Sequence, residues 1–427
     1  MLAMRFPRIL LLLVMASLLT ADASLLLAGQ TFRIQSVRVI GSQRYPEEDL
    51  VAALGFKPGD TIALDALQKA ADRLMQSGAL ASLQYKYTPL STGLVVEYTV
   101  ADSRDFLPCS YDNIVWINSE ELTKAVHQKV PLFDGEAPSS GELLDQVAQA
   151  ISQLLAQRGV VTKVIYELNS RVAGAPIDAI SFVSDSVVPK IRDITLTGAN
   201  LLSPQEKMEN TKRLVGEPYR ARQLRESLVN GLFFIYGNKG YLRMQVGEPQ
   251  ATLVGDPQQA MVAVTVPVTE GSQFRWASIS WSGNTALTKA ELDSMMAIRS
   301  GDIADHSRLD TSLSAVQRAY KSRGYLAVQL KRVPTFDDQY HTVSYMVDVS
   351  EGDLFHMGNL RLLGLEPGVA EKLQKKWKLN RGDVYNGQYL QTFLKDNAGL
   401  ISEGRSRTVK STEMQTPEHL VDVTLQF

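Results

Sequence analysis

Apolar and polar residues alternate along several short stretches of the chain, with the period of two that a β-strand with one covered face produces. Valine occupies every second position of 262–268, and the same alternation recurs over 343–349 and 421–427. We interpret these apolar stripes as core faces rather than as ligand-binding positions. Each stripe lies near the end of a longer repeated segment.

The repeated segments open with a strand-like pattern that ends at a glycine. The clear openings are Val37–Gly41, Ile194–Gly198, Ile279–Gly283 and Leu360–Gly364. A weaker opening, Ile114–Asn118, has Asn in place of the glycine, and we expect it to be the first strand of a divergent repeat. Self-similarity at this spacing is typical of arrays of small domains.

Two further landmarks follow each opening in a constant order. The first is a glycine followed by an acid, at Gly59-Asp60, Gly135-Glu136, Gly216-Glu217, Gly301-Asp302 and Gly382-Asp383. The second is a glycine four residues after an apolar residue, at Gly78, Gly159, Gly240, Gly324 and Gly404. We expect the first landmark to end one helix with a left-handed cap and the second to end the next helix. Each repeat therefore reads β-α-α-β-β.

Helix start signals support this order. Ser203 and Glu206 have the spacing of a capping box, with Pro204 at the first helical position, and Thr288 and Glu291 repeat the spacing. The second helices are amphipathic, with apolar residues at helical spacing.

The first 23 residues have the pattern of a secretory signal peptide. Two arginines precede an apolar run, Ile9–Leu19, which is too short to span a bilayer, and Ala21-Asp22-Ala23 supplies small residues for cleavage. The alternative is an uncleaved membrane anchor, which the second apolar patch at 25–27 favours.

Composition and motifs predict no catalytic chemistry. The 427 residues carry a formal charge of −2, so nothing indicates nucleic-acid binding. The single cysteine, Cys109, excludes an intramolecular disulfide, and the five histidines share no ligand spacing. We predict no catalytic residue, no metal ligand and no cofactor.

The segments Tyr320–Tyr325 and Tyr236–Tyr241, which read Tyr-x-x-x-Gly-Tyr, resemble POTRA (polypeptide-transport-associated) domains. So do the exits Thr269-Glu270-Gly271 and Ser350-Glu351-Gly352, each leading to a phenylalanine. The resemblance implies an α+β fold, a tandem array of five domains, each with a three-stranded mixed sheet and two helices on one face. The expected ranges are 1–23 for the signal peptide and 32–101, 108–187, 189–271, 272–352 and 353–427 for the domains, the second being divergent.

POTRA domains form the periplasmic arm of bacterial outer-membrane protein insertases, where a membrane β-barrel follows the arm. This sequence ends at Phe427, the expected last strand, so it resembles an arm without the barrel. It is then either a partner of a separate barrel or a truncated product. The resemblance implies a periplasmic location at the outer membrane, peripheral to the bilayer. It implies as partners an outer-membrane β-barrel protein, unfolded outer-membrane polypeptides and envelope lipoproteins, but no nucleic acid.

In the family's strand order, the first closing strand of each domain is an open sheet edge, to which an extended peptide can add as a further strand. The candidate peptide-binding residues are Leu83, Tyr85, Leu242, Met244, Leu326, Val328 and Leu330, and the structural turn residues are Gly78, Gly159, Gly240, Tyr241, Gly324, Tyr325 and Gly404. Charged residues and Pro334 would instead blunt these edges. The alternative function is a structural adaptor, in cell division or lipid transport, that contacts folded partners only.

Overall fold

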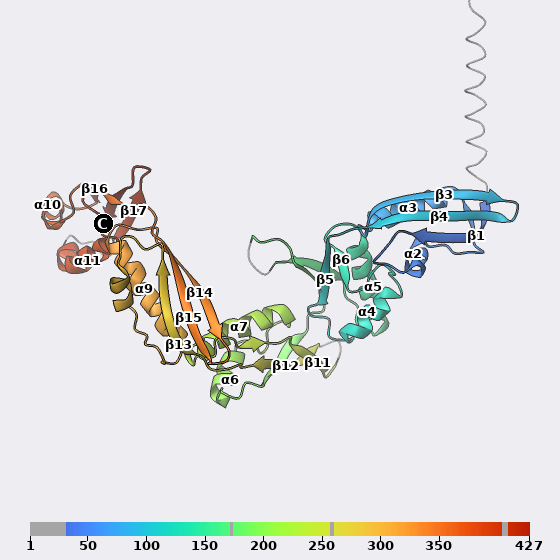
Figure 1. Cartoon of the computed structure of the whole chain (residues 1–427), viewed down its shortest axis with the longest axis horizontal. Coiled ribbons are helices and arrows are strands. Elements are labelled where there is room, and N and C mark those ends of the chain that lie inside the picture. Colours follow the sequence, from blue (N-terminus) through green and yellow to red (C-terminus); the bar gives the residue numbers. More distant parts are fainter. Residues whose placement is uncertain (1–30, 171–173, 257–259, 404–408) are drawn as a thin grey trace, which may run out of the picture. The chain divides into compact units, whose positions relative to one another are not determined.

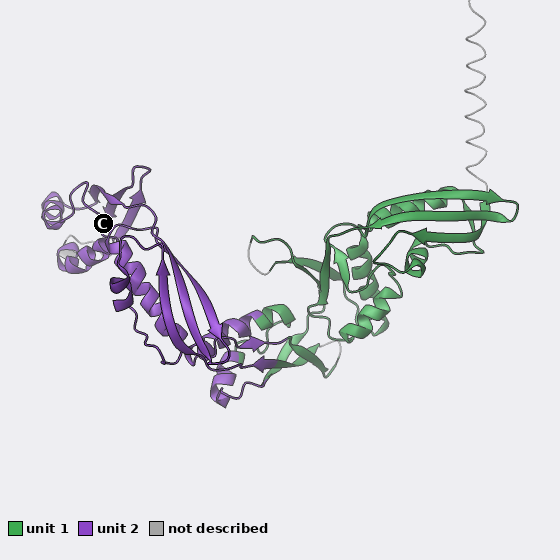
Figure 2. Cartoon of the chain, in the orientation of Figure 1, with its two compact units in different colours: residues 1–196, 211–225, 248–266 green, residues 197–210, 226–247, 267–427 purple. Residues whose placement is uncertain are grey.

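The computed structural model describes residues 31–170, 174–256, 260–403 and 409–427 (Figure 1). The expected signal peptide lies outside these residues. The chain divides into two compact units, one comprising residues up to 196 with 211–225 and 248–266, the other comprising 197–210, 226–247 and 267–427 (Figure 2). Within the described ranges the strands form five sheets, and we number each sheet with its helices as domains 1 to 5. Domain 3 contributes residues to both units.

Domain 1 has a four-stranded sheet in the order β2-β1-β4-β3, in which β1 and β4 are parallel and the other pairs antiparallel. Its elements are β1 (Thr31–Ile40), α2 (Glu47–Leu54), β2 (Thr61–Ala63), α3 (Asp65–Gln76), β3 (Leu80–Leu90) and β4 (Gly93–Asp102). The hydroxyl of Tyr98 on β4 donates to the carbonyl of Leu67 on α3, and both residues are fully buried.

Domain 2 repeats this arrangement in the order β6-β5-β8-β7. Its elements are β5 (Phe106–Tyr111), α4 (Ser119–His127), β6 (Glu136–Pro138), α5 (Leu143–Gln157), β7 (Val164–Asn169) and β8 (Ala179–Ser184). The prediction of an opening strand at 114–118 is wrong. Strand β5 precedes it, and Ile114 and Ile117 are buried core residues outside any strand. Asn118 instead caps α4 by accepting the Glu120 amide.

Domain 3 contains β9 (Lys190–Thr197), α6 (Pro204–Thr211), α7 (Ala221–Asn238), β10 (Gln245–Val246), β11 (Gln250–Val254) and β12 (Met261–Thr269). Strands β10 and β11 both pair antiparallel with β12, so they form one closing strand interrupted at 247–249. Strand β9 also pairs with β12.

Domains 4 and 5 have three-stranded mixed sheets, in the orders β13-β15-β14 and β16-β18-β17. Domain 4 comprises β13 (Arg275–Ser282), α8 (Lys289–Ser294), α9 (His306–Ser322), β14 (Gln329–Asp337) and β15 (Thr342–Ser350). Domain 5 comprises β16 (His356–Leu363), α10 (Pro367–Lys376), α11 (Tyr389–Asp396), α12 (Ala398–Glu403), β17 (Lys410–Gln415) and β18 (Leu420–Gln426). The α+β fold of repeated mixed sheets is thereby confirmed.

The predicted valine stripes are core faces. All four valines of 262–268 are at most 5% exposed, and Val343, Val347 and Val349 are as deeply buried. The cores of domains 1 and 2 join into one continuous apolar cluster within the first unit, whereas domains 4 and 5 each have a core of their own.

The glycine–acid landmark does not end the first helix as expected. Helix α2 ends at Leu54, where Gly55 is the left-handed cap, and Gly59-Asp60 lies in the next turn. There the Gly59 amide donates to the Ile34 carbonyl and the Ile34 amide donates to the Asp60 carbonyl, both at 2.8 Å. The Asp60 carboxylate accepts the Lys57 amide at 2.9 Å. The acid therefore closes a turn that pairs with the opening strand, and this pairing extends to the short strands β2 and β6, which make the first two sheets four-stranded.

Candidate functional site: domain joints and open sheet edges

The glycine that ends the second helix of domains 3 and 4 also contacts the next domain. At Gly240 the backbone φ is +83°, and its carbonyl accepts the Phe274 amide at 2.8 Å. A Cβ on Gly240 would lie 2.8 Å from the Phe274 carbonyl oxygen and 2.9 Å from Ile303 Cγ2. Gly324 has the same role, because its carbonyl accepts the Phe355 amide at 2.9 Å. Only glycine fits this backbone conformation and this close approach.

The other turn glycines show how far this joint geometry repeats. Gly78 also closes its helix with a positive φ, and a Cβ there would overlap the Ser140 backbone of domain 2. Gly159 has φ +83°, but no atom lies within 4 Å of its Cβ position. Gly404 lies outside the described residues.

The residues after Gly240 and Gly324 lie in turns rather than on the sheet edge. Leu242 packs against the core of domain 4, and Leu326 packs against the core of domain 5. Tyr241 and Tyr325 make edge-on ring contacts with Tyr236 and Tyr320, at 6.2 and 6.1 Å between centroids. These contacts hold the Gly-Tyr-Leu segment against the joint before the closing strand begins.

The predicted edge residues therefore fall into two groups. Leu83 and Tyr85 lie on β3, and Leu330 lies on β14. The other four precede β10 or β14 and do not lie on a strand, so the prediction that they form a strand edge is wrong. They are Leu242, Met244, Leu326 and Val328.

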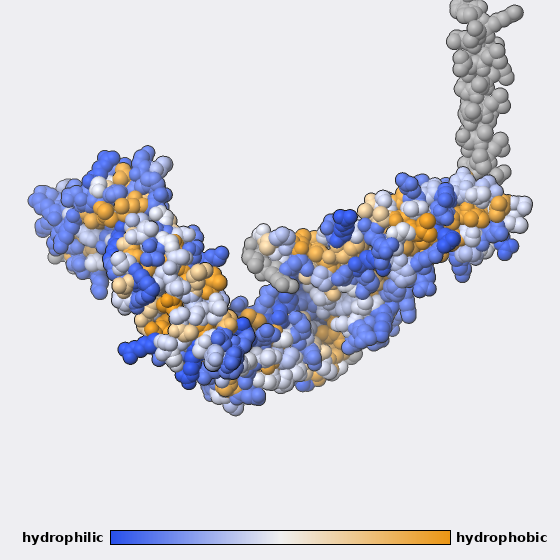
Figure 3. Space-filling view, viewed as in Figure 1, coloured by the Kyte–Doolittle hydropathy of each residue, from blue (hydrophilic) through white to orange (hydrophobic). Residues whose placement is uncertain are grey.

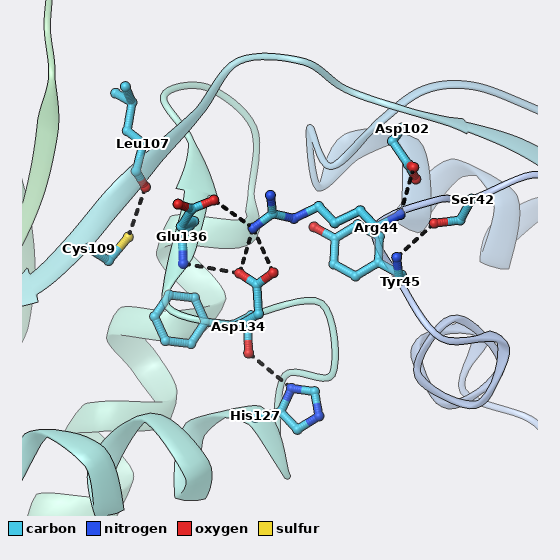
Figure 4. Close-up of polar contacts among 10 residues, drawn as sticks. Ser42, Arg44, Tyr45, Asp102, Leu107, Cys109, His127, Asp134 and Glu136 are labelled. Atoms are coloured by element: carbon cyan, nitrogen blue, oxygen red, sulfur yellow. Dashed lines mark hydrogen bonds and ion pairs between the residues drawn. The ribbon is translucent and has the colours of Figure 1, made fainter.

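An arginine clamp joins domains 1 and 2 (Figure 4). One Arg44 guanidinium nitrogen donates to Asp134 at 2.6 Å and to Glu136 at 3.0 Å, and its carbon lies 3.9 Å from the centre of the Phe106 ring. The Arg44 amide donates to Asp102 at 3.0 Å. Ion pairing and a cation–π contact thus fix the loop after β1 against domain 2.

A second arginine, at a different position of the repeat, makes similar contacts between domains 3 and 4. Arg243 donates to Asp338 at 2.6 Å, and its guanidinium carbon lies 4.3 Å from the centre of the Phe336 ring. The corresponding position between domains 4 and 5 is Ala327, so this joint has no arginine there. Instead, the Gly387 amide donates to the Lys321 carbonyl at 2.9 Å.

The joint between domains 2 and 3 is built differently. Asp112, which follows β5, accepts the Arg222 amide at 2.8 Å at the start of α7, and Arg220 lies 3.5 Å from the same carboxylate. Arg220 also pairs with Glu167 at 3.1 Å. Burial raises the pKa of Asp112, although the Arg222 amide and Arg220 oppose that shift.

An acid at the end of the closing strand fastens the loop that follows the opening strand. Glu351 accepts the Thr285 amide at 2.6 Å and the Ala286 amide at 2.8 Å, and Asp102 and Glu270 make similar bonds in domains 1 and 3. Burial acts to raise the pKa of Glu351, but these hydrogen bonds outweigh it and hold the pKa below its ordinary value. The acids of the Thr-Glu-Gly and Ser-Glu-Gly exits were the available sequence signal for this role.

Strand β3 is an open edge of the domain 1 sheet, eleven residues long. Tyr85 faces the helices, where its ring lies 5.3 Å from Tyr98 and its hydroxyl donates to Gln68 on α3. Tyr87, two residues further on, is 42% exposed. The intervening Lys86 faces the other side and pairs with Glu97 at 2.7 Å.

The first closing strands β7, β14 and β17 also lie at the edges of their sheets, but these edges differ from that of β3. Strand β14 carries Lys331, Pro334 and an ion pair between Arg332 and Asp310, all of which discourage further pairing. Strand β7 is a short edge, and every residue of β17 is exposed.

Within the described parts of the chain, no group of three His, Cys, Asp or Glu side chains could hold a metal ion, and no helix is long and apolar enough to cross a membrane. Burial raises the pKa of Cys109 to about 12, with smaller contributions from Asp134 and Glu136. A thiol with a raised pKa stays mostly protonated at neutral pH, and the protonated form is the weaker nucleophile.

Parts of the chain are similar to known proteins. The family model of POTRA, described as "Surface antigen variable number repeat", matches residues 32–100 and 274–352. The outer membrane protein assembly factor BamA of Neisseria meningitidis serogroup B is 20% identical over 257 residues, which are 58% of this chain and 32% of the relative. The chain thus spans about a third of the length of that relative.

Two solved structures are also similar. POTRA domains 3–5 of Haemophilus influenzae BamA are 22% identical, cover 56% of this chain and 96% of their own, and give a TM-score of 0.42. POTRA domains 1–3 of Omp85 from Anabaena are 15% identical. This match covers 76% of the present chain and 97% of the Anabaena chain, with a TM-score of 0.20. The matched segments at 32–100 and 274–352 coincide with domains 1 and 4, so these two domains are similar to the POTRA family model.

Proposed function

We propose that the chain is a non-enzymatic binding module of the cell envelope that receives extended outer-membrane polypeptides by strand addition. The open edge of β3 is the observation that carries this proposal. The name of the Neisseria relative, an outer membrane protein assembly factor, supports the class of substrate. The proposed location is the periplasm, at the outer membrane. The proposed partners there are a barrel protein, its unfolded polypeptides and envelope lipoproteins.

The length of β3 suits weak and reversible binding. An unpaired edge offers a row of amides and carbonyls, and each backbone hydrogen bond contributes a net of about 0.5–1.5 kcal/mol. Ordering an extended peptide costs about 1–2 kcal/mol per residue, which cancels that gain, so the net affinity is small and depends on cross-strand side-chain pairs. Binding through the backbone is also tolerant of sequence, as a module that hands over many different polypeptides requires.

The two sides of β3 differ in a way that favours one kind of peptide. Leu83, Tyr85 and Tyr87 share the side facing the helices, whereas Gln84 and Lys86 share the polar side. An added strand whose residues alternate between apolar and polar would match both rows. Strands of membrane β-barrels have this alternation.

The experiment is a titration of the mature chain, labelled at its Leu and Val methyl groups, with a peptide from a barrel strand, followed by NMR. We expect shifts confined to the neighbourhood of Leu83 and of the paired Val96 and Val100. Tyr87→Lys should weaken binding about two- to five-fold, because one cross-strand pair is worth up to about 1 kcal/mol. Thr88→Lys, on the opposite side of the strand, is the matched control and should have no such effect.

Absence of shifts at millimolar peptide would overturn capture by β3. The adaptor that contacts folded partners would then be favoured, since the clamped joints suit a scaffold in either case.

A further inference from the structure

Domain 5 differs from the other four domains in the charge of its first helix and of the loop that follows. Between the start of that helix and the glycine–acid turn, residues 367–381 contain five basic residues and one acid, a net charge of +4. The equivalent segments 47–58, 119–134, 204–215 and 289–300 have net charges of −2, −1, +1 and 0. The fold of the repeat therefore does not itself require basic residues at this position.

Five exposed basic side chains lie on α10 and in the loop that follows it, and we call them together the α10 basic face. Its members are Lys372, Lys375, Lys376, Lys378 and Arg381, and all five are exposed. Leu373 is fully buried, and Val369 and Trp377 also pack against the core of domain 5. The lysines at 372, 375 and 376 lie on α10 beside these residues, and all three are exposed to solvent. The surface over α10 is correspondingly hydrophilic in Figure 3.

Little within the described chain neutralises this face. Glu371 pairs with Lys375 at 2.8 Å, one helical turn away, and both side chains are more than two-thirds exposed. The Asp383 carboxylate is occupied by the Asn380 amide at 2.6 Å in the glycine–acid turn. Outside the segments left undescribed, Lys372, Lys376, Lys378 and Arg381 form no ion pair.

We propose that the α10 basic face binds the anionic headgroups of a phospholipid bilayer. Four of the five charges are lysines, which act as mobile point charges and suit a diffuse layer of phosphates rather than one ligand held in a fixed geometry. Three of these lysines lie on the exposed part of α10, which suits a broad planar partner more than an extended peptide. A negatively charged bilayer attracts each nearby basic residue enough to strengthen binding about five-fold. The face thereby holds domain 5 at the membrane surface without inserting any residue into it.

The test is flotation of the full mature chain with phosphatidylcholine vesicles, prepared with and without phosphatidylglycerol. We expect binding only to the anionic vesicles, and loss of that binding at high salt. A variant with Lys372→Gln, Lys375→Gln, Lys376→Gln and Lys378→Gln should bind at least about tenfold more weakly.

The matched control removes four lysines of similar exposure from other domains, as Lys69→Gln, Lys86→Gln, Lys124→Gln and Lys289→Gln. It should retain most of the binding, because the effect depends on the α10 basic face and not on net charge. Equal loss in both variants would overturn the proposal, as would equal binding to neutral vesicles. Capture of polyglutamate through the same lysines, without vesicle binding, would also overturn it and identify an acidic polypeptide as the occupant.

Discussion

Replacing Gly240 by alanine should loosen the joint between domains 3 and 4. Two costs are expected. The φ of +83° places alanine in the left-handed region, at about 1–2 kcal/mol. The added Cβ would also lie 2.8 Å from the Phe274 carbonyl oxygen, a backbone atom that cannot rotate away. Overpacking of this kind costs about 1–3 kcal/mol, so the total is about 2–5 kcal/mol.

Comparison with Gly159→Ala isolates the second cost, that of the close contact. Gly159 has the same φ of +83° and also ends a second helix, but nothing lies within 4 Å of its Cβ position. This variant should therefore lose only the left-handed cost. The difference between the two variants measures the contact across the joint.

The assay is hydrogen exchange of the full chain, resolved by peptide, because a multi-domain chain does not unfold in one two-state step. Gly240→Ala should speed exchange at the Phe274 amide and at the start of α9. Gly159→Ala should leave both unchanged. Equal exchange at these sites in the two variants would refute the close approach inferred for Gly240.

Three further predictions follow from other contacts. Arg44→Ala should speed exchange over 106–111 by removing the clamp, whereas Arg38→Ala, whose ion pair is 3.7 Å long and exposed, should not. The pKa of Glu291 is held at about 2, first by the Thr288 amide of its capping box. The helix stability that Glu291 adds should be complete above its ordinary pKa of 4.5 and should fall as the pH drops toward 2; a pH titration of α8 exchange, with Glu291→Gln as the flat control, checks it. Cys109 should react with iodoacetamide far more slowly at pH 8 in the folded chain than in urea, and equal rates would contradict its burial.

The repeats themselves were predictable from the sequence because they rest on local chemistry. Glycines at positions of positive φ and valines at every second position report the conformation of their own segment. The valine stripes are confirmed, as are the described glycines that end the second helices, whereas the glycine–acid landmark lies beyond the end of the first helix. The strand at 106–111 was missed for the converse reason. Around Cys109 and Ser110 apolar and polar residues do not alternate, so no sequence pattern indicated a strand there. Ile114 and Ile117 are apolar because they are buried in a loop, and they imitate a strand pattern.

The joints were not predictable because they connect residues far apart in sequence. Arg44 meets Asp134 and Glu136 across 90 and 92 positions, and no local pattern distinguishes it from other surface arginines. The edge residues Leu242 and Leu326 were assigned to strands because they are apolar and precede an alternating stretch. Their shared place in the triad Gly-Tyr-Leu was the available signal that both belong to a joint.

The hydrogen bond from Phe274 to Gly240 has a consequence for the order in which the array folds. The end of α7 lacks its partner until the first strand of the following domain arrives, and Phe355 completes the end of α9 in the same way. Coupling between neighbours of this kind makes the stability of a repeat depend on the repeat after it. A domain excised at its sequence boundary should therefore be less stable than the same domain within the chain. During synthesis from the N-terminus, domains 3 and 4 should each become fully stable only after the following domain has been made.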